Sequence, residues 1–148
     1  MAKSLVQKVV IYCVQGDRIL VFRHLDFSWE EVGIQVPAGS IKENEAPAAA
    51  ALRELIEETG HSGFVVEVFL GTARYDLSPY RAEIQERHFF RARPTQDLPE
   101  RWPSQELHDG TQPPTRLECF WLPIAAAHVL QAGQGAMLWM LGVEEQPL

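Results

Sequence analysis

The sequence predicts an α+β fold in which a mixed β-sheet lies between helices. Along most of the chain, β-branched and aromatic runs alternate with turn-forming residues, which is typical of strands. Residues 45–59 instead have the composition and periodicity of a helix. The last 30 residues hold only two charged side chains, Glu144 and Glu145, so we expect this region to pack on the sheet.

Length and composition predict a single domain over residues 1–148. A chain of this length buries a core without disulfides, and no repeat or linker divides it. The net charge of −7 argues against a surface that binds nucleic acid polymers. The apolar run 136–143 is too short to span a bilayer, and residues 1–14 do not resemble a signal peptide. Cys13 and Cys119 lack metal-ligand spacing, which favours buried free thiols in a cytoplasmic protein.

The first predicted elements are a β-hairpin and a short strand. Residues 9–14 and 19–22 are β-branched and aromatic, and turn-like residues 15–18 separate them. A polar loop is expected over residues 24–33. Residues 36–39 end the next strand, because their proline and glycine do not continue a central ladder.

The helix predicted over residues 45–59 is rich in alanine, and Pro47 is tolerated there because it lies in the first turn. Gly60 is a natural helix stop. At about 100° per residue, one stripe is apolar and suited to packing on the sheet. Its members are Ala48, Leu52, Leu55, Ile56 and Thr59. The opposite face carries three carboxylates, those of Glu54, Glu57 and Glu58.

The second half of the chain predicts three more strands. Residues 64–70 and 84–92 are rich in valine and phenylalanine, and residues 117–122 are a plausible final strand. The polar stretch 93–116 holds five prolines and is predicted to be a long loop. A helical region is expected over residues 124–141, broken at two glycines, Gly133 and Gly135.

The three carboxylates on one helix face indicate a cation site. Like charges three and four residues apart repel each other, so the arrangement benefits the helix only when a cation is present. Mg²⁺ or Mn²⁺ prefers carboxylate oxygens and leaves positions open for phosphate. Arg53 is placed to hold one carboxylate by a bidentate contact. Taken alone, however, such a cluster also fits an ordinary solvated helix face.

The segment before the helix favours the metal site. Gly39 is followed after five residues by Glu45, and after seven more by Arg-Glu-Leu-Ile-Glu-Glu-Thr-Gly at residues 53–60. This stretch, Gly39 to His61, resembles the Nudix box and matches every fixed position of it. His61 is the one departure, because an aliphatic residue is usual there, and we expect it to affect packing just beyond the helix.

The resemblance implies a Nudix-type α/β/α sandwich and a Mg²⁺-dependent hydrolase, with Mn²⁺ as an alternative ion. The family hydrolyses a small molecule, a nucleoside diphosphate linked to another group X, by attack of water on the pyrophosphate bridge. Many relatives dimerise, so a homodimer is left open. The catalytic residues implied are Glu57, Glu58 and Arg53, with Glu45 in support. The metal ligands implied are Glu54, Glu57, Glu58 and the carbonyl oxygen of Gly39.

The general base stays open between box glutamates and acidic residues from later segments. The candidates are Glu57, Glu58, Glu86, Glu100 and Glu106. Substrate recognition is also open. Five aromatic side chains are candidates for stacking on a nucleobase, with ordinary packing as the alternative: Phe27, Trp29, Tyr75, Tyr80 and Trp102. Candidates for phosphate contacts, or for surface ion pairs, are Arg23, Arg74, Arg81 and Arg87.

Two rival functions share the fold. A noncatalytic Nudix-fold sensor would bind a nucleotide without cleaving it, but a pure binder has no need of three repelling carboxylates. The isomerase branch, which acts on isoprenoid diphosphates, needs further metal-binding histidines and a catalytic cysteine. Neither Cys13 nor Cys119 lies in a cleft-like sequence context.

Overall fold

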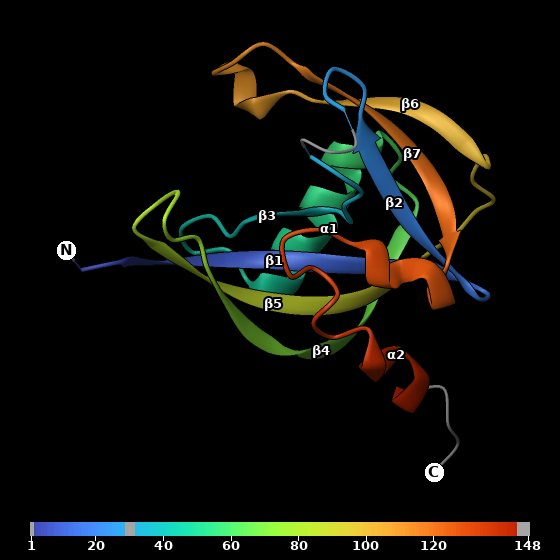
Figure 1. The fold of residues 1–148 in the computed structure, drawn as a ribbon. Coiled ribbons are helices and arrows are strands. Elements are labelled where there is room, and N and C mark those ends of the chain that lie inside the picture. Colours follow the sequence, from blue (N-terminus) through green and yellow to red (C-terminus); the bar gives the residue numbers. More distant parts are fainter. Residues whose placement is uncertain (1, 29–31, 145–148) are drawn as a thin grey trace.

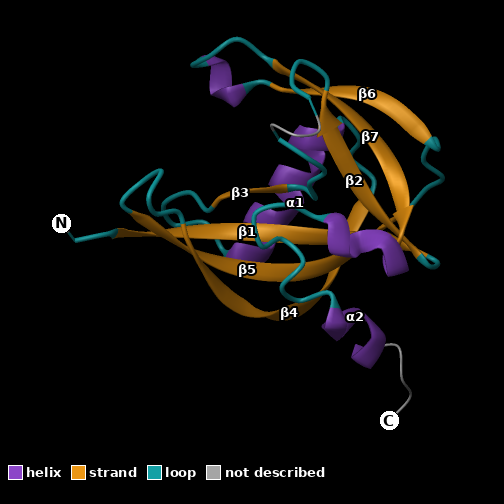
Figure 2. Ribbon diagram, in the orientation of Figure 1, coloured by secondary structure: helices purple, strands orange, loops and turns teal. Residues whose placement is uncertain are grey.

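The computed structural model describes residues 2–28 and 32–144, and its strands and helices follow one another as drawn in Figures 1 and 2. The helices are α1 (Pro47–Thr59) and the short α2 (Trp139–Glu144), with two 3₁₀ turns, η1 (His108–Gly110) and η2 (Ile124–Val129). The strands are β1 (Ser4–Gln15), β2 (Arg18–His24), β3 (Ala38–Ser40), β4 (Phe64–Asp76), β5 (Glu83–Pro94), β6 (Arg101–Glu106) and β7 (Thr115–Pro123).

The strands form a mixed sheet with the order β4-β5-β1-β2-β7-β6, and β3 pairs with β1. Strands β1 and β5 are parallel, whereas the other pairs are antiparallel. The predicted hairpin is confirmed, but β1 and β2 pair only beside their turn, at Val14 with Ile19 and Gln15 with Arg18. The sheet therefore opens beyond the hairpin, and α1 lies in the opening, in contact with β1, β3, β4, β5 and β6 (Figure 1).

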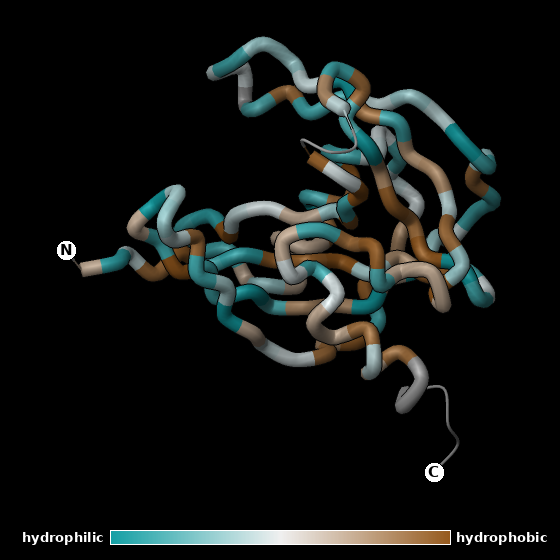
Figure 3. The backbone as a smooth tube through the Cα atoms, viewed as in Figure 1, coloured by the Kyte–Doolittle hydropathy of each residue, from teal (hydrophilic) through white to brown (hydrophobic). Residues whose placement is uncertain are grey.

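Both faces of the sheet are covered. Along β1, Val9 and Ile11 point into one buried cluster with α1, while Val10 and Tyr12 point into a second cluster on the other face. Leu141 belongs to that second cluster, so the expected packing of the C-terminal region on the sheet is confirmed. Figure 3 shows the same distinction between the sheet and its connections. The middle of β2 is hydrophobic, whereas the segment between β6 and β7 is mostly hydrophilic.

Helix α1 ends as predicted, and its buried face overlaps the predicted apolar stripe but is rotated from it. Gly60 adopts a left-handed φ of 76°, and its N–H donates to the carbonyl oxygen of Ile56 over 2.9 Å. Of the predicted apolar stripe, Leu55 and Thr59 are buried and Leu52 and Ile56 pack against the core, but Ala48 is exposed. The buried positions are Ala50, Ala51, Glu54, Leu55, Glu58 and Thr59. Their mean direction is rotated by about 100° from Leu52, which turns two of the three carboxylates inward.

The long loop predicted over residues 93–116 is wrong in part, because it contains β6. Pro103 is tolerated there since β6 is the edge strand and needs no ladder on its outer side. Trp102 anchors the strand by donating its indole N–H to the carbonyl oxygen of Thr59 over 2.8 Å. The helical region predicted over residues 124–141 is likewise reduced to η2, turns and the start of α2. In the described residues, no helix is long and apolar enough to cross a membrane.

Candidate active site

The site is built where β3 passes over α1. Gly39 in β3 lies against the carboxyl group of Glu54, and a Cβ on Gly39 would stand 2.1 Å from the Glu54 carboxyl carbon. Ala38, the preceding residue, donates its backbone N–H to Oε1 of Glu58 over 3.0 Å. Glycine at this point is therefore what allows the strand backbone and the buried carboxylates of the helix to meet.

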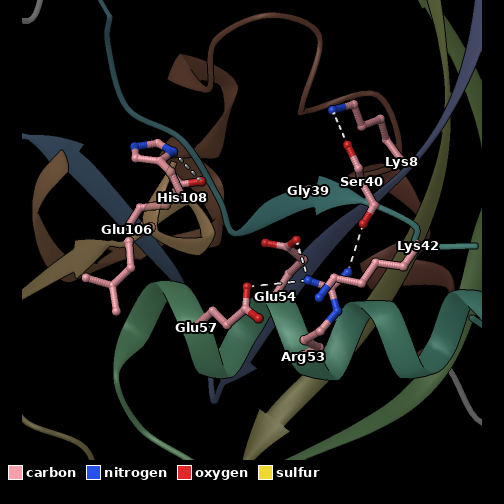
Figure 4. A pocket seen from close by; sticks show the side chains of 11 residues that line it. Lys8, Gly39, Ser40, Lys42, Arg53, Glu54, Glu57, Glu106 and His108 are labelled. Atoms are coloured by element: carbon pink, nitrogen blue, oxygen red, sulfur yellow. Dashed lines mark hydrogen bonds and ion pairs between the residues drawn. The ribbon is translucent and has the colours of Figure 1, made fainter. Parts of the chain in front are cut away.

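Arg53 organises the acidic residues around it (Figure 4). Its Nε and Nη2 donate to the two carboxylate oxygens of Glu45 over 2.8 and 2.9 Å. Nη1 donates to Glu54 over 2.8 Å and to Glu57 over 3.4 Å, and Nη2 also donates to the carbonyl oxygen of Ser40 over 2.8 Å. The bidentate contact expected of Arg53 is thus made to Glu45, while Glu54 receives a single hydrogen bond.

These contacts set the protonation of the group. Hydrogen bonds from Arg53 and from the Lys42 backbone lower the pKa of Glu45 to about 2. Burial raises the pKa of Glu54, against the opposing effect of Arg53. Burial and the neighbouring Glu54 carboxylate raise the pKa of Glu58 well above its usual range. Two carboxylates that share a buried site in this way gain strongly from an additional positive charge.

A cavity of about 540 Å³ opens above these residues. Glu54, Glu57 and Arg53 form its α1 wall, while Glu106 and His108 come from β6 and the segment after it (Figure 4). The remaining lining residues include three that sequence reasoning missed, Lys8, Ser40 and Lys42. The available signal was a lysine directly before the apolar run 9–14, because a charged side chain in a strand needs access to solvent or to a cavity.

The structure separates the candidates for the general base. Glu57 and Glu106 line the cavity, and Glu58 is buried next to Glu54. Glu86 is paired with Arg74 at 3.0 Å, and Glu100 with Arg18 at 2.5 Å, so both are held at ion pairs outside the cavity.

The aromatic candidates divide similarly. Trp102 is buried and packs edge-on against His61, with ring centroids 5.0 Å apart, so it is a structural residue. That contact is also how the departure at His61 is accommodated. Tyr80 and Phe27 are exposed, Tyr75 stacks on Arg87, and Trp29 lies outside the described residues.

The arginine candidates also fall into separate groups. Arg23 pairs with Glu118 at 2.8 Å, Arg74 pairs with Glu86, and Arg81 is exposed. Arg87 is buried, and it lines a second cavity.

The donor set suits a hard divalent cation such as Mg²⁺. Carboxylate oxygens and a backbone carbonyl are the ligands such ions prefer, and the close approach of Glu54 to Gly39 brings both kinds together. As they stand, no three acidic, histidine or cysteine side chains in the described ranges already converge as a metal cage. Figure 4 shows that the exposed Glu57 shares the Nη1 of Arg53 with Glu54.

Comparison with known proteins identifies relatives of this arrangement. A family model described as the NUDIX domain matches residues 5–138. The chain is 59% identical over 34 residues to an "ADP-sugar pyrophosphatase" of Mus musculus, a stretch that covers 23% of this chain and 16% of that protein. It is 32% identical over 98 residues to an "RNA pyrophosphohydrolase" of Brucella ovis, covering 62% of this chain and 55% of that protein. The chain thus spans about half the length, or less, of these curated relatives.

Solved structures share the fold. A NUDIX hydrolase from Nitrosomonas europaea aligns with a TM-score of 0.67 and 20% identity, covering 94% of this chain and 90% of that one. A MutT NUDIX hydrolase from Burkholderia pseudomallei aligns with a TM-score of 0.69 and 17% identity, covering 94% and 99%. A UDP-X diphosphatase aligns with a TM-score of 0.65 and 14% identity, covering 99% and 66%. The predicted α+β sandwich is confirmed by these likenesses.

Proposed function

The chain belongs to the NUDIX domain family, and from that premise we propose that it is a metal-dependent pyrophosphohydrolase. Its substrate would be a small nucleoside diphosphate derivative, cleaved by water at the pyrophosphate bridge. The observation that carries the proposal is the meeting of Glu54 with Gly39 beneath a cavity that also holds Lys8 and Lys42. The carboxylates of α1 on one wall of this cavity would bind a cation, and the two lysine side chains on another wall would bind phosphate.

Glu54, Glu57 and Glu58, with the carbonyl oxygen of Gly39, would hold Mg²⁺ or Mn²⁺. When bound, the ion supplies charge neutralisation for the phosphate oxygens and lowers the pKa of a coordinated water. Glu54 and Glu58 gain most from that charge, because burial raises the pKa of both and the Glu54 carboxylate raises that of Glu58 further.

The other residues of the site bind and orient. Arg53 is a positioning residue, because it fixes Glu45, Glu54 and the Ser40 carbonyl oxygen in one network. Lys8 and Lys42 would bind the phosphate oxygens of the substrate. Glu57, Glu58 and Glu106 are the remaining candidates to accept the proton of the attacking water, and the last of these faces the helix from β6.

The setting of the reaction is part of the same proposal. Both cysteines are free and buried, which suits a reducing compartment such as the cytoplasm. The net charge of −7 disfavours broad binding to a nucleic acid polymer, so we propose a small substrate. A homodimer is an assembly compatible with the family.

A noncatalytic nucleotide sensor is the second candidate. It is favoured by one observation, that Arg53 already pairs with Glu54 and Glu57, so part of their negative charge is balanced without an added cation. Such a protein would bind nucleotides in the same cavity and release them unchanged.

A substrate panel distinguishes the two. The protein is incubated with Mg²⁺ and with ADP-ribose, sugar nucleotides, dinucleoside polyphosphates, nucleoside triphosphates or 5′-triphosphorylated RNA, and the products are identified by mass. We expect cleavage of a small diphosphate-linked nucleotide, with the solvent oxygen incorporated into one phosphate product. Cleavage of the RNA alone would contradict the small-substrate proposal, and binding without any product would favour the sensor.

A further inference from the structure

A second cavity, of about 350 Å³, adjoins the first. The two share Lys8, Gly39 and Glu106, so one ligand can extend from one into the other. Val10, Ala38 and Leu77 contribute apolar walls to the second cavity. Besides the shared Lys8 and Glu106, its polar side chains are those of Gln35, Gln85, Arg87 and Gln134.

Arg87 is a buried cation that lacks an acidic partner among the described residues. It is 7% exposed. Its Nε donates to Oε1 of Gln85 over 3.0 Å, its Nη1 donates to the carbonyl oxygen of Ala132, and its guanidinium lies 4.3 Å from the centre of the Tyr75 ring. Burial lowers its pKa. Since a buried charge without a counter-charge is costly, a guanidinium in this position is typical of a ligand contact.

Gln134, like Arg87, has a side-chain N–H donor without a hydrogen-bond partner in the described part of the chain. It is 8% exposed, and its Oε1 accepts the backbone N–H of Val36 over 2.8 Å, which fixes the orientation of the amide. The backbone around it is anchored by the Tyr12 hydroxyl, which donates to the Gln134 carbonyl oxygen over 2.5 Å. The Nε2 of Gln134 has no hydrogen-bond partner within the described residues, and the same holds for Nη2 of Arg87.

On the wall that Gln85, Arg87 and Gln134 form, the side-chain acceptors are therefore engaged while the donors of Arg87 and Gln134 remain available, and the other acceptors of the lining belong to Gln35 and Glu106. Oε1 of Gln134 is occupied by Val36, and Oε1 of Gln85 is occupied by Arg87. A ligand group placed here meets N–H groups. A carbonyl oxygen or an unprotonated ring nitrogen of the ligand accepts hydrogen bonds from these N–H groups. An amino group of the ligand is itself a donor, so it would leave the buried N–H groups without an acceptor.

We propose that this second cavity binds the nucleobase of the substrate and selects bases that carry an oxo group over bases that carry an amino group at the same position. This rests on the proposed function, because the base and the diphosphate belong to one molecule. Guanine or hypoxanthine offers O6 and N7 to Arg87 and Gln134, and uracil offers O4. Adenine and cytosine place an amino group there instead.

The test is equilibrium binding of nucleoside monophosphates, measured by titration calorimetry with Mg²⁺ present. Inosine and adenosine monophosphate form one matched pair, and uridine and cytidine monophosphate form another. None contains a diphosphate bond, so the measurement does not depend on hydrolysis. We expect the oxo member of each pair to bind about tenfold more tightly.

Three variants locate the effect. Arg87→Met removes the donors but keeps an unbranched side chain, and we expect the preference for oxo bases to fall toward none. Gln134→Glu keeps the acceptor for Val36 and replaces the free donor by an acceptor, so it should also reduce the preference. Arg74→Met, at an exposed arginine of the neighbouring strand that is paired with Glu86, is the matched control and should leave the preference unchanged.

Equal or tighter binding of the amino bases by the unaltered chain overturns the proposal, and so does the absence of binding by all four ligands. An unchanged preference in folded Arg87→Met, judged by its melting temperature, overturns the role of that residue. Oxo selectivity without hydrolysis of any diphosphate would leave this inference standing while the proposed activity fails. Hydrolysis without base selectivity would support the proposed activity and overturn this inference.

Discussion

The carboxyl carbon of Glu54 lies 2.1 Å from the position that a Cβ on Gly39 would occupy. A side chain on Gly39 fits only if the Glu54 side chain, the strand or the helix moves. Only glycine at position 39 permits this close approach. The residue that it approaches, Glu54, is one of the carboxylates in the proposed metal site.

Gly39→Ala is therefore expected to displace Glu54 and to lower kcat about 100-fold, since displacements near 1 Å have effects of that size. The measurement is steady-state hydrolysis together with a thermal melt. Gly135→Ala is the control, because a Cβ there meets first the end of the flexible Leu138 side chain, at 3.1 Å. Full activity in Gly39→Ala would show that the contact has no part in catalysis.

Arg53→Lys should lower kcat by about 10–100-fold, because a single ammonium cannot hold Glu45 with two parallel hydrogen bonds while also reaching Glu54. The melting temperature should fall as well. Arg116→Lys is the matched control, since Arg116 also grips a carboxylate, that of Asp26, but at an exposed site. Equal loss of activity in both variants would rule out a specific role for Arg53.

Glu58→Gln should lower kcat by about 100-fold or more while leaving the metal-free protein as stable or more stable. The amide oxygen still accepts the Ala38 N–H, and the substituted side chain carries no charge to bury. The raised pKa of Glu58 means that the wild-type carboxyl takes up a proton as the pH falls. The stability difference between variant and wild type should therefore be largest at alkaline pH and shrink below that pKa.

Thermal melts over a pH series measure this difference, and Glu100→Gln serves as an exposed control. A variant that is clearly less stable than the wild type at every pH would contradict the expected cost of burying the Glu58 charge.

Mg²⁺ should raise the melting temperature by mass action. At a free concentration 100 times Kd, the gain is about 2.7 kcal/mol, or about 5–10 °C for a chain of this size. The shift should disappear with a chelator and in the double variant Glu54→Gln/Glu57→Gln, but persist in Glu100→Gln. An unchanged melting temperature at millimolar Mg²⁺ would favour the sensor.

Both thiols should resist alkylation in the native protein. Cys13 and Cys119 are at most 1% exposed, and burial raises the pKa of each to about 12. At pH 8 only about one thiol in ten thousand is ionised, so iodoacetamide should label neither until the chain unfolds. Because unfolded thiols ionise at lower pH, stability should fall as the pH rises from about 9 toward 12. Rapid native labelling, read by mass spectrometry, would contradict this burial.

Local sequence patterns predicted much of the fold correctly. The hairpin at β1 and β2, the stop of α1 at Gly60 and the strands β4, β5 and β7 are determined by neighbours along the chain, through turn chemistry and side-chain periodicity. Strand β6 was missed because its proline content indicates a loop. Only its place at the sheet edge, and the burial of Trp102 against Thr59, make it a strand.

The spacing of the Nudix box determined, from the sequence alone, that Arg53 and three glutamates share a helix of a NUDIX domain. Tertiary structure decided how they are used. Packing in the open sheet turned Glu54 and Glu58 toward the core, and it joined Arg53 to Glu45. It also placed Glu106 by the cavity rather than Glu86 or Glu100, and it buried Arg87 beside Gln134. These contacts depend on strand order and helix rotation, which arise from long-range packing that no local pattern encodes.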